Sequence, residues 1–187
     1  MNHIEKLIKE LCPNGVEFKA LGDNVEIYTG KQFNKRDMQE IGTYPVINGG
    51  IYPSGYIENF NETENTITIS QGGASAGYVN FMFSKFWAGA HCYVVKPNNK
   101  NLINKFLYYF LKNLENNLMS LKYGAGIPAL NSNHIKKLQI PLPPLEIQNE
   151  IVKILDTFTE LETELEARHK QYEYYRERLL SFKALNA

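Results

Sequence analysis

Residues 141–158 read PLPPLEIQNEIVKILDTF, and this stretch separates two different patterns in the chain. Two adjacent prolines, Pro143 and Pro144, stiffen the backbone, and the second can open a helix because a first-turn residue needs no N–H donor. No glycine or proline follows between Leu145 and Ala187. The sequence therefore predicts a globular domain over residues 1–141 and one long helix over residues 142–187.

The predicted long helix carries one apolar stripe at alternating spacings of three and four, which is the heptad pattern of paired helices. At 1.5 Å per residue, roughly 38 residues would form a rod about 57 Å long. One small domain cannot cover such a stripe, so we expect a partner helix from a second copy, although folding back onto its own domain is the alternative. Arg168 is the one charged residue on the stripe. Its apolar and aromatic members are Ile151, Ile154, Phe158, Leu161, Leu165, Tyr172, Tyr175, Leu179 and Phe182.

Before the prolines, the pattern is that of short strands interrupted by turns. Runs rich in β-branched and aromatic residues predict strands, and Gly, Pro and Asn clusters between them predict turns. The strands are expected at Tyr44–Ile47, Thr66–Ser70, Tyr78–Phe83 and His91–Val95, with a last extended piece at Gln139–Leu142.

Helical spacing surrounds these strands. It predicts an amphipathic helix at Met1–Leu11, a longer one at Leu102–Leu121 that ends at Gly124–Pro128, and a short one at Asn131–Leu138. The expected fold class is therefore α+β: a β-rich globular domain with flanking helices, followed by one long helix of the coiled-coil type.

Composition limits the possible functions. With 43% hydrophobic residues the chain can build a packed core, and no apolar run reaches the length of a membrane span. The N-terminal segment is amphipathic and unlike a signal peptide, so we expect a cytoplasmic protein. The net charge of zero hides an asymmetry: 14 Lys and Arg stand against 11 Asp and Glu up to Ile140, and 6 against 9 afterwards. A mildly basic domain permits DNA binding without demanding it.

The sequence contains no recognisable catalytic motif. Glycine-rich cofactor loops and the phosphate-binding loop are absent, and the four histidines lack metal-ligand spacing. Cys12 and Cys92 form no CxxC pair. His91 and Cys92 are neighbours in a predicted strand, so their side chains should point to opposite faces and cannot act as base and nucleophile. We therefore expect a protein that is not an enzyme and that binds no metal or cofactor itself.

Several motifs together resemble the specificity (S) subunits of type I restriction–modification systems. The resemblance covers essentially the whole chain, except that a complete S subunit has two target-recognition domains and two long helices, whereas this chain has one of each. It therefore resembles a half-length form. The matching segments are Leu11–Phe18, Tyr44–Gly50, Ile67–Gly73, Gly124–Pro128, Pro141–Gln148, Glu150–Val152, Ile154–Asp156 and Arg168–Leu180.

The resemblance implies a role without chemistry in this chain. Residues 1–141 would be the target-recognition domain, reading one half of a split site on double-stranded DNA, and the long helix would set the spacing. Two copies would pair with their helices antiparallel, and a two-fold symmetric dimer predicts a palindromic target. The helices would also dock methyltransferase (M) subunits, which hold S-adenosylmethionine and methylate adenine, and restriction (R) subunits would add cleavage.

Three short segments are candidates for the DNA contact. A basic loop after Tyr28-Thr29-Gly30 could hold phosphates or read guanine, although it could equally be a solvated charged loop. A polar strand end beside glycines could read adenine, or be an ordinary hairpin turn. The candidates are Lys31, Gln32, Lys35 and Arg36 in the first segment, Ser70, Gln71, Gly72 and Gly73 in the second, and Lys122 and Tyr123 in the third.

Two other functions remain open at this point. A stand-alone dimeric DNA-binding regulator would also have a basic domain and a pairing helix, although the chain has no recognisable helix-turn-helix. A structural adaptor would bind protein instead of DNA, and its binding would be insensitive to salt.

Overall fold

Strand β5 (Thr66–Ser70) lies in the middle of the domain, and all five of its residues are buried. The computed structural model describes residues 3–124 and 128–182. Ile67 and Ile69 point to one face of the strand, and the small polar side chains of Thr66, Thr68 and Ser70 point to the other, as a period of two requires. Packing against both faces of this strand organises the rest of the domain.

The main sheet has four antiparallel strands in the order β2-β8-β5-β6. The other strands are β2 (Val25–Thr29), β6 (Val79–Met82) and β8 (Cys92–Pro97). Helices α2 (Asn104–Asn113), α3 (Glu115–Ser120) and α4 (Ser132–Lys136) contribute to the core on one face. The large core on this face includes Ile67, Val95, Leu107, Leu111 and Ile135, all fully buried.

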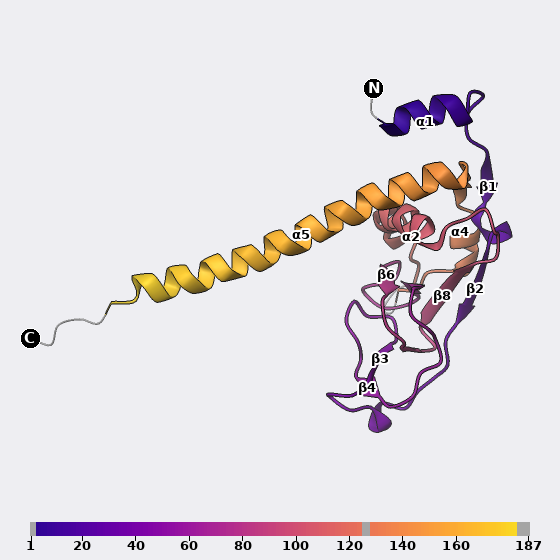
Figure 1. Cartoon of the computed structure of the whole chain (residues 1–187). Helices are drawn as coiled ribbons and strands as arrows, with labels where there is room; N and C mark the ends of the chain where they lie inside the picture. Colours follow the sequence, from indigo (N-terminus) through magenta and orange to yellow (C-terminus); the bar gives the residue numbers. More distant parts are fainter. Residues whose placement is uncertain (1–2, 125–127, 183–187) are drawn as a thin grey trace, which may run out of the picture.

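A smaller apolar cluster lies on the other face of the main sheet, beside a three-stranded sheet in the order β4-β3-β7. These strands are β3 (Tyr44–Ile47), β4 (Tyr56–Ile57) and β7 (Trp87–Ala88), and β3 pairs with β7 in parallel. The cluster joins Ile47 and Ala88 to Cys92 and Val94 of β8. Figure 1 shows β3 and β4 at the end of the domain farthest from the long helix.

A two-stranded sheet closes the domain next to the long helix. Strand β1 (Phe18–Ala20) follows helix α1 (His3–Leu11) and pairs antiparallel with β9 (Gln139–Pro141), which directly precedes Pro143 and Pro144. The 3-10 turn η1 (Leu21–Asp23) then leads into β2, and a second one, η2 (Lys35–Asp37), follows it. The segment near the start of the domain and the segment near its end are thus held side by side.

Helix α5 (Leu145–Leu180) has 36 residues, which gives a length of about 54 Å. It extends away from the domain (Figure 1), and every residue from 157 to 180 is exposed. The prediction of a long C-terminal helix is confirmed, and the alternative that the helix folds back onto its own domain is wrong. The helix ends at Leu180, so Phe182, the last residue of the predicted stripe, lies beyond it.

Gln148 holds the first turns of α5 in the domain. Its side chain is completely buried; its Oε1 accepts the Ile103 N–H at 2.9 Å, and its Nε2 donates to the carbonyls of Asn101 at 2.7 Å and Pro143 at 2.8 Å. Ile147 is buried beside it. The division between residues 141 and 142 stays a prediction, and the first turn of the helix packs into the domain through Ile147 and Gln148.

Tyr109 of α2 makes a second connection, two turns further along α5. Its hydroxyl donates to the Asp156 carboxylate, and Lys105 Nζ lies 3.2 Å from the same carboxylate. Burial first, and then this hydrogen bond, raise the pKa of Tyr109 to about 12, so the phenol stays a donor at physiological pH. These contacts fix the direction in which α5 leaves the domain.

The α+β class is confirmed, and two details differ from the sequence-based expectation. The helix expected over Leu102–Leu121 is two helices, because the chain breaks at Leu114 and the Glu115 carboxylate accepts the Val79 N–H at 2.8 Å and Lys112 Nζ at 2.6 Å. The end of that helix at Gly124–Pro128 lies mostly outside the described residues. β1, β2, β4 and β7 had not been assigned. Among the helices the structure describes, none is both long and apolar enough to cross a membrane.

Candidate nucleic-acid interface

The basic loop after β2 is anchored at its first residue. The Lys31 N–H donates to Ala88 O at 2.8 Å, and Trp87 Nε1 donates to Lys31 O at 2.9 Å. Phe33 packs edge-on against the Trp87 ring, with ring centroids 5.1 Å apart. The backbone of the loop is therefore fixed, while the predicted side chains Lys31, Gln32, Lys35 and Arg36 are exposed to solvent.

Gly30 makes this anchoring possible. A Cβ at this position would lie 2.1 Å from Ala88 O, closer than any real contact. Only glycine lets the two backbones approach so closely. The small residue in the Tyr28-Thr29-Gly30 motif therefore sets the path of the basic loop.

A groove of about 400 Å³ lies between the basic loop and the loop after β3. Gln32 and Lys35 belong to its lining, together with five residues that are not among the predicted DNA contacts: Phe33, Asn34, Met38, Asn48 and Ser54. Asn48 belongs to the matching segment Tyr44–Gly50 and to a predicted turn, but no sequence pattern indicated that it lies near Gln32. The groove is open to solvent, and its lining mixes polar and apolar side chains.

The second and third candidate segments lie side by side. Gly73 N–H donates to Pro128 O at 2.8 Å, and Leu130 N–H donates to Gln71 O at 2.7 Å. Tyr123 and Ala129 exchange two backbone hydrogen bonds of 2.9 Å, and Lys122 Nζ donates to Ala74 O at 3.3 Å. The structure therefore brings Ser70–Gly73 next to Lys122 and Tyr123, which are 50 residues away in sequence.

Ser70 and Gln71 point into the fold. The Ser70 hydroxyl donates to Gly49 O, and Gln71 Nε2 donates to the Tyr93 hydroxyl at 3.1 Å, which in turn donates to Leu130 O at 3.0 Å. Lys122 and Tyr123, by contrast, are exposed. The DNA contact predicted for all these residues stays a prediction, but the bonds give Ser70 and Gln71 a structural role in shaping the loop ends.

The turn at Asn48 and Gly49 joins the two groups of candidates. Asn48 Oδ1 accepts the His91 N–H at 3.2 Å, and Gln71 N–H donates to His91 O at 2.9 Å. Gly49 O is the acceptor for Ser70, while Asn48 also lines the groove beside the basic loop. All three candidate segments are therefore connected at one end of the domain.

The cations of the domain fall into two classes. Lys96, Lys105 and Lys112 each form an ion pair with a carboxylate. Lys31, Lys35, Arg36 and Lys122 are exposed, and none of them forms an ion pair with any residue that the structure describes. Their positive charge is not neutralised by any residue that the structure describes, so these four side chains are available to phosphates. Lys85, Lys100, Lys136 and Lys137 are likewise exposed and form no ion pair among the described residues, but they lie outside the three candidate segments.

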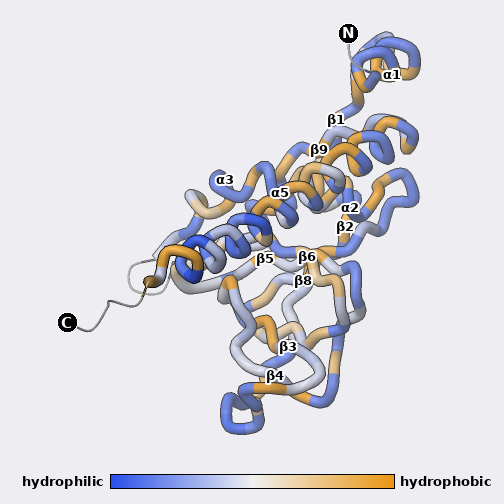
Figure 2. Tube along the Cα trace, turned by 60° about the vertical axis from the view of Figure 1, so that its left-hand side comes forward, coloured by the Kyte–Doolittle hydropathy of each residue, from blue (hydrophilic) through white to orange (hydrophobic). Residues whose placement is uncertain are grey.

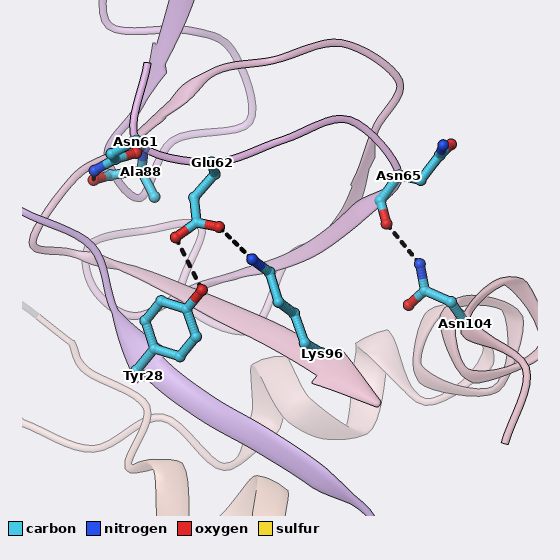
Figure 3. Close-up of polar contacts among 7 residues, drawn as sticks. All are labelled: Tyr28, Asn61, Glu62, Asn65, Ala88, Lys96 and Asn104. Atoms are coloured by element: carbon cyan, nitrogen blue, oxygen red, sulfur yellow. Dashed lines mark hydrogen bonds and ion pairs between the residues drawn. The ribbon is translucent and has the colours of Figure 1, made fainter. Parts of the chain in front are cut away.

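The Glu62 carboxylate is an example of the first, structural class (Figure 3). It accepts the Tyr28 hydroxyl at 2.9 Å and Lys96 Nζ at 2.6 Å, and Glu62 is buried. Burial, chiefly, raises the pKa of Tyr28. Burial alone would lower the pKa of Lys96, but hydrogen bonds with Glu62 and Tyr28 outweigh it and raise the pKa. The three side chains join β2 and β8 to the loop before β5.

No reactive arrangement accompanies the interface. His91 is exposed and Cys92 is buried, so the two neighbouring side chains do not form a pair, and burial raises the pKa of Cys92 to about 12. Among the residues that the structure describes, no group of His, Cys, Asp or Glu could hold a metal ion.

The second candidate surface is the stripe on α5, called the seam here and defined as Ile154, Phe158, Leu161, Leu165, Arg168, Tyr172, Tyr175 and Leu179. Its apolar members are all large and exposed, with Leu165 and Leu179 each 70% exposed. In Figure 2, hydrophobic stretches recur between hydrophilic ones along α5. Ile151 differs, because it already packs against the domain core, and Phe182 lies beyond the helix end.

Comparison with known proteins identifies similar sequences and folds. A family model described as the type I restriction modification DNA specificity domain matches residues 13–172. The type I restriction enzyme EcoR124I/EcoR124II specificity subunit of Escherichia coli is 32% identical over 201 residues, which cover 98% of this chain and 48% of that protein. The MjaVIII specificity subunit of Methanocaldococcus jannaschii is 30% identical over 158 residues, covering 80% of this chain and 37% of that protein.

A solved structure has the same fold. The S subunit of a type I restriction–modification system from M. genitalium superimposes with a TM-score of 0.73 at 26% identity, over 89% of this chain and 46% of that one. The chain thus spans about half the length of the relatives it matches.

Proposed function

The chain belongs to the type I restriction–modification DNA specificity family, and we propose that it is a non-catalytic DNA-recognition subunit that works as a homodimer. Relatives of this family are about twice as long. Two copies of the present chain would supply two recognition domains and two long helices. The dimer reads a bipartite DNA site, and its two-fold symmetry makes that site palindromic.

The observation that carries this proposal is the seam on α5. Seven large apolar side chains are exposed along one face of a helix whose contacts with its own domain, among the described residues, end at Thr159. A stripe of this size at heptad spacing is stable in water only when a second helix covers it. A second copy of the same chain supplies such a helix.

The DNA interface of each domain is the end at which the three candidate segments meet. The exposed, unpaired Lys31, Lys35, Arg36 and Lys122 contact phosphates or guanine, and Gln32 and Tyr123 complete the surface. Ser70–Gly73 hold the neighbouring loops in place, with the glycines allowing close approach of the DNA backbone. The groove beside Asn48 is where a base edge can be read.

The partners follow from the same proposal. M subunits dock on the paired helices, hold S-adenosylmethionine and methylate adenine in the cytoplasm, while R subunits join for cleavage. This chain needs no cofactor of its own. Its contribution is to place the M subunits at a chosen sequence.

Methylation mapping tests the proposed function. The chain is co-expressed with the M subunit of its own system, and methylated adenines in the host DNA are mapped by single-molecule sequencing. We expect a split, palindromic motif that appears only when this chain is present. A stable complex without new methylation would contradict the proposal that one kind of half subunit is sufficient. Tight operator binding without any M subunit would favour a stand-alone regulator, and salt-insensitive binding would favour a protein-binding adaptor.

A further inference from the structure

The seam has a centre, and this centre determines how two copies can pair. Read from either end, its spacings are 4, 3, 4, 3, 4, 3, 4, so the pattern is symmetric about the bond between Glu166 and Ala167. Two antiparallel helices that cross at this point place Ile154 opposite the partner's Leu179 and Phe158 opposite the partner's Tyr175. Leu161 then faces the partner's Tyr172. Each apolar side chain of the seam then faces another large apolar side chain, except Leu165, which faces the partner's Arg168.

The position of Arg168 near the centre of the seam favours the antiparallel arrangement. In a parallel dimer in register, the two Arg168 side chains would meet in the apolar interface, where like charges are costly. In the antiparallel arrangement each Arg168 lies opposite the partner's Leu165, and it keeps the Glu164 carboxylate of its own helix at 3.4 Å. The stem of the arginine can then cover the leucine while its charged end stays in water.

A groove at the start of α5 continues the seam. It has a volume of about 320 Å³, lies between α1, α2 and α5, and has an almost entirely apolar lining that includes Ile8, Phe110, Ile151 and Leu155. At 100° per residue, Ile147 and Ile151 in the groove and Ile154 and Phe158 on the seam fall within about 60° of arc. A helix that lies along the seam therefore runs into this groove.

The register also determines which residues of the second copy lie at this groove. Extending the symmetric pairing by one step places Ile151 opposite the partner's Phe182. Phe182 is 84% exposed and lies just beyond the end of α5. We propose that the groove between α1, α2 and α5 is filled by Leu179 and Phe182 of a second copy, in an antiparallel dimer centred between Glu166 and Ala167. This inference rests on the homodimer proposed above. By two-fold symmetry each copy fills the groove of the other.

Disulfide trapping tests the register and the occupant together. All variants carry Cys12→Ser, and Cys92 is buried. The double variant Ile151→Cys/Phe182→Cys is oxidised mildly and run on a non-reducing gel, beside the two single variants. We expect a covalent dimer from the double variant only. In the antiparallel arrangement, a cysteine at either position lies about 46 Å from the equivalent cysteine of the second copy, so a single variant cannot form the bond. Covalent dimers from the single variants would show parallel helices and overturn the inference.

Light scattering on the same reduced samples separates this inference from the proposed function. A dimer mass without cross-linking would overturn the register and the groove occupant but leave the homodimer intact, and would point to another partner for the groove. A monomer mass for the Cys12→Ser parent would overturn both.

A second variant avoids any change in the domain core. Phe182→Asp lies outside the helix and should weaken dimerisation at least about tenfold, because a buried Phe contributes roughly 1.5–3 kcal/mol. Ser181→Asp is the matched control, and it should leave the dimerisation constant within about twofold. Equal constants for the two variants would show that Phe182 is not buried in the dimer.

Discussion

The side-chain amide of Gln148 shows that the residues after the two prolines not only begin α5 but also anchor it to the domain. Its three hydrogen bonds connect α5 to the loop before α2 and to Pro143, in a position with no access to water. A buried amide with all these partners is specific, because no apolar side chain of similar size can satisfy the same N–H and carbonyl groups. The segment Pro141–Gln148, which resembles the S-subunit family, therefore has a structural role: it fixes the start of α5 in the domain.

Replacing this amide should destabilise the domain. Gln148→Leu leaves the Ile103 N–H and two carbonyls without partners, and we expect the free energy of unfolding to fall by about 3 kcal/mol. The exposed neighbour gives the control, because Asn149→Leu should change stability by less than about 0.5 kcal/mol. Urea titration followed by circular dichroism measures both. Indistinguishable midpoints would mean that Gln148 is not an anchor of the helix.

The two cysteines should differ in reactivity. Because burial raises the pKa of Cys92 to about 12 from 9.0, the folded protein keeps this thiol protonated where the unfolded chain loses its proton. The Cys92 contribution to stability is therefore present below about pH 9 and decreases as pH rises towards about 12. In Cys12→Ser protein at about pH 8.5, a thiol reagent should label Cys92 only after denaturation. Rapid labelling of the native protein would contradict this expectation.

At the scale of elements, α5 has two surfaces with different tasks. Its first turns pack into the domain through Ile147, Gln148 and Ile151, and Asp156 binds Tyr109. From residue 157 to the end of the helix every residue is exposed, and the last contact with the domain among the described residues is that of Thr159 Oγ1 with the Tyr109 hydroxyl at 3.3 Å. No residue that the structure describes covers the apolar face beyond this point. A rigid attachment followed by an exposed seam is the arrangement needed to hold two domains at a fixed separation.

Charges on the seam should separate the two copies. Phe158→Asp with Leu165→Asp replaces apolar contacts of the helix interface by carboxylates, and at position 158 the carboxylate faces Tyr175 of the other copy with no cation opposite it. We expect the molar mass by light scattering to fall from that of a dimer to that of a monomer. Thr163→Asp with Lys170→Asp introduces the same residue type away from the seam, and should leave the dimer intact. If the seam variant kept the mass of the parent, helix pairing would not occur through this face.

For the whole molecule, the proposed surface for DNA recognition and the proposed surface for helix pairing lie on different parts of the structure. The basic loop shares a groove with Asn48, the residue that follows β3, and β3 lies at the end of the domain farthest from α5 (Figure 1). A contact with DNA and a contact between helices can therefore form without competing for the same surface. Separate sets of variants should consequently affect DNA binding and dimerisation independently.

Removing the basic loop charges should weaken DNA binding without changing the mass of the dimer. For Lys31→Ala/Lys35→Ala/Arg36→Ala in complex with the M subunit, we expect the slope of log K against log salt to fall by about 0.9 for each lost phosphate contact per domain. Lys136→Ala/Lys137→Ala removes exposed charges from the region of α4 and serves as the control. Fluorescence anisotropy at several salt concentrations measures the slopes, and equal slopes for both variants would place the DNA elsewhere.

Much of the local structure followed from short-range patterns. Tyr44–Ile47 and Thr66–Ser70 are strands with the predicted bounds, and the alternation of heptad spacings predicted α5 to within a few residues. These features depend on repeats of two and 3.6 residues, which neighbouring side chains reveal by themselves. The family could also be recognised from the sequence, because the motifs that carry the resemblance are contiguous segments.

The positions that depend on distant contacts were determined only by the tertiary structure. The pairing of β3 with β7, the break at Leu114, and the groove that joins Gln32 to Asn48 each connect residues far apart or use a side chain on another element. Ile151 belongs to the predicted stripe by spacing, yet the domain core partly covers it. Periodicity states which face of a helix is apolar, whereas the packing of the whole chain determines which part of that face remains free for a partner.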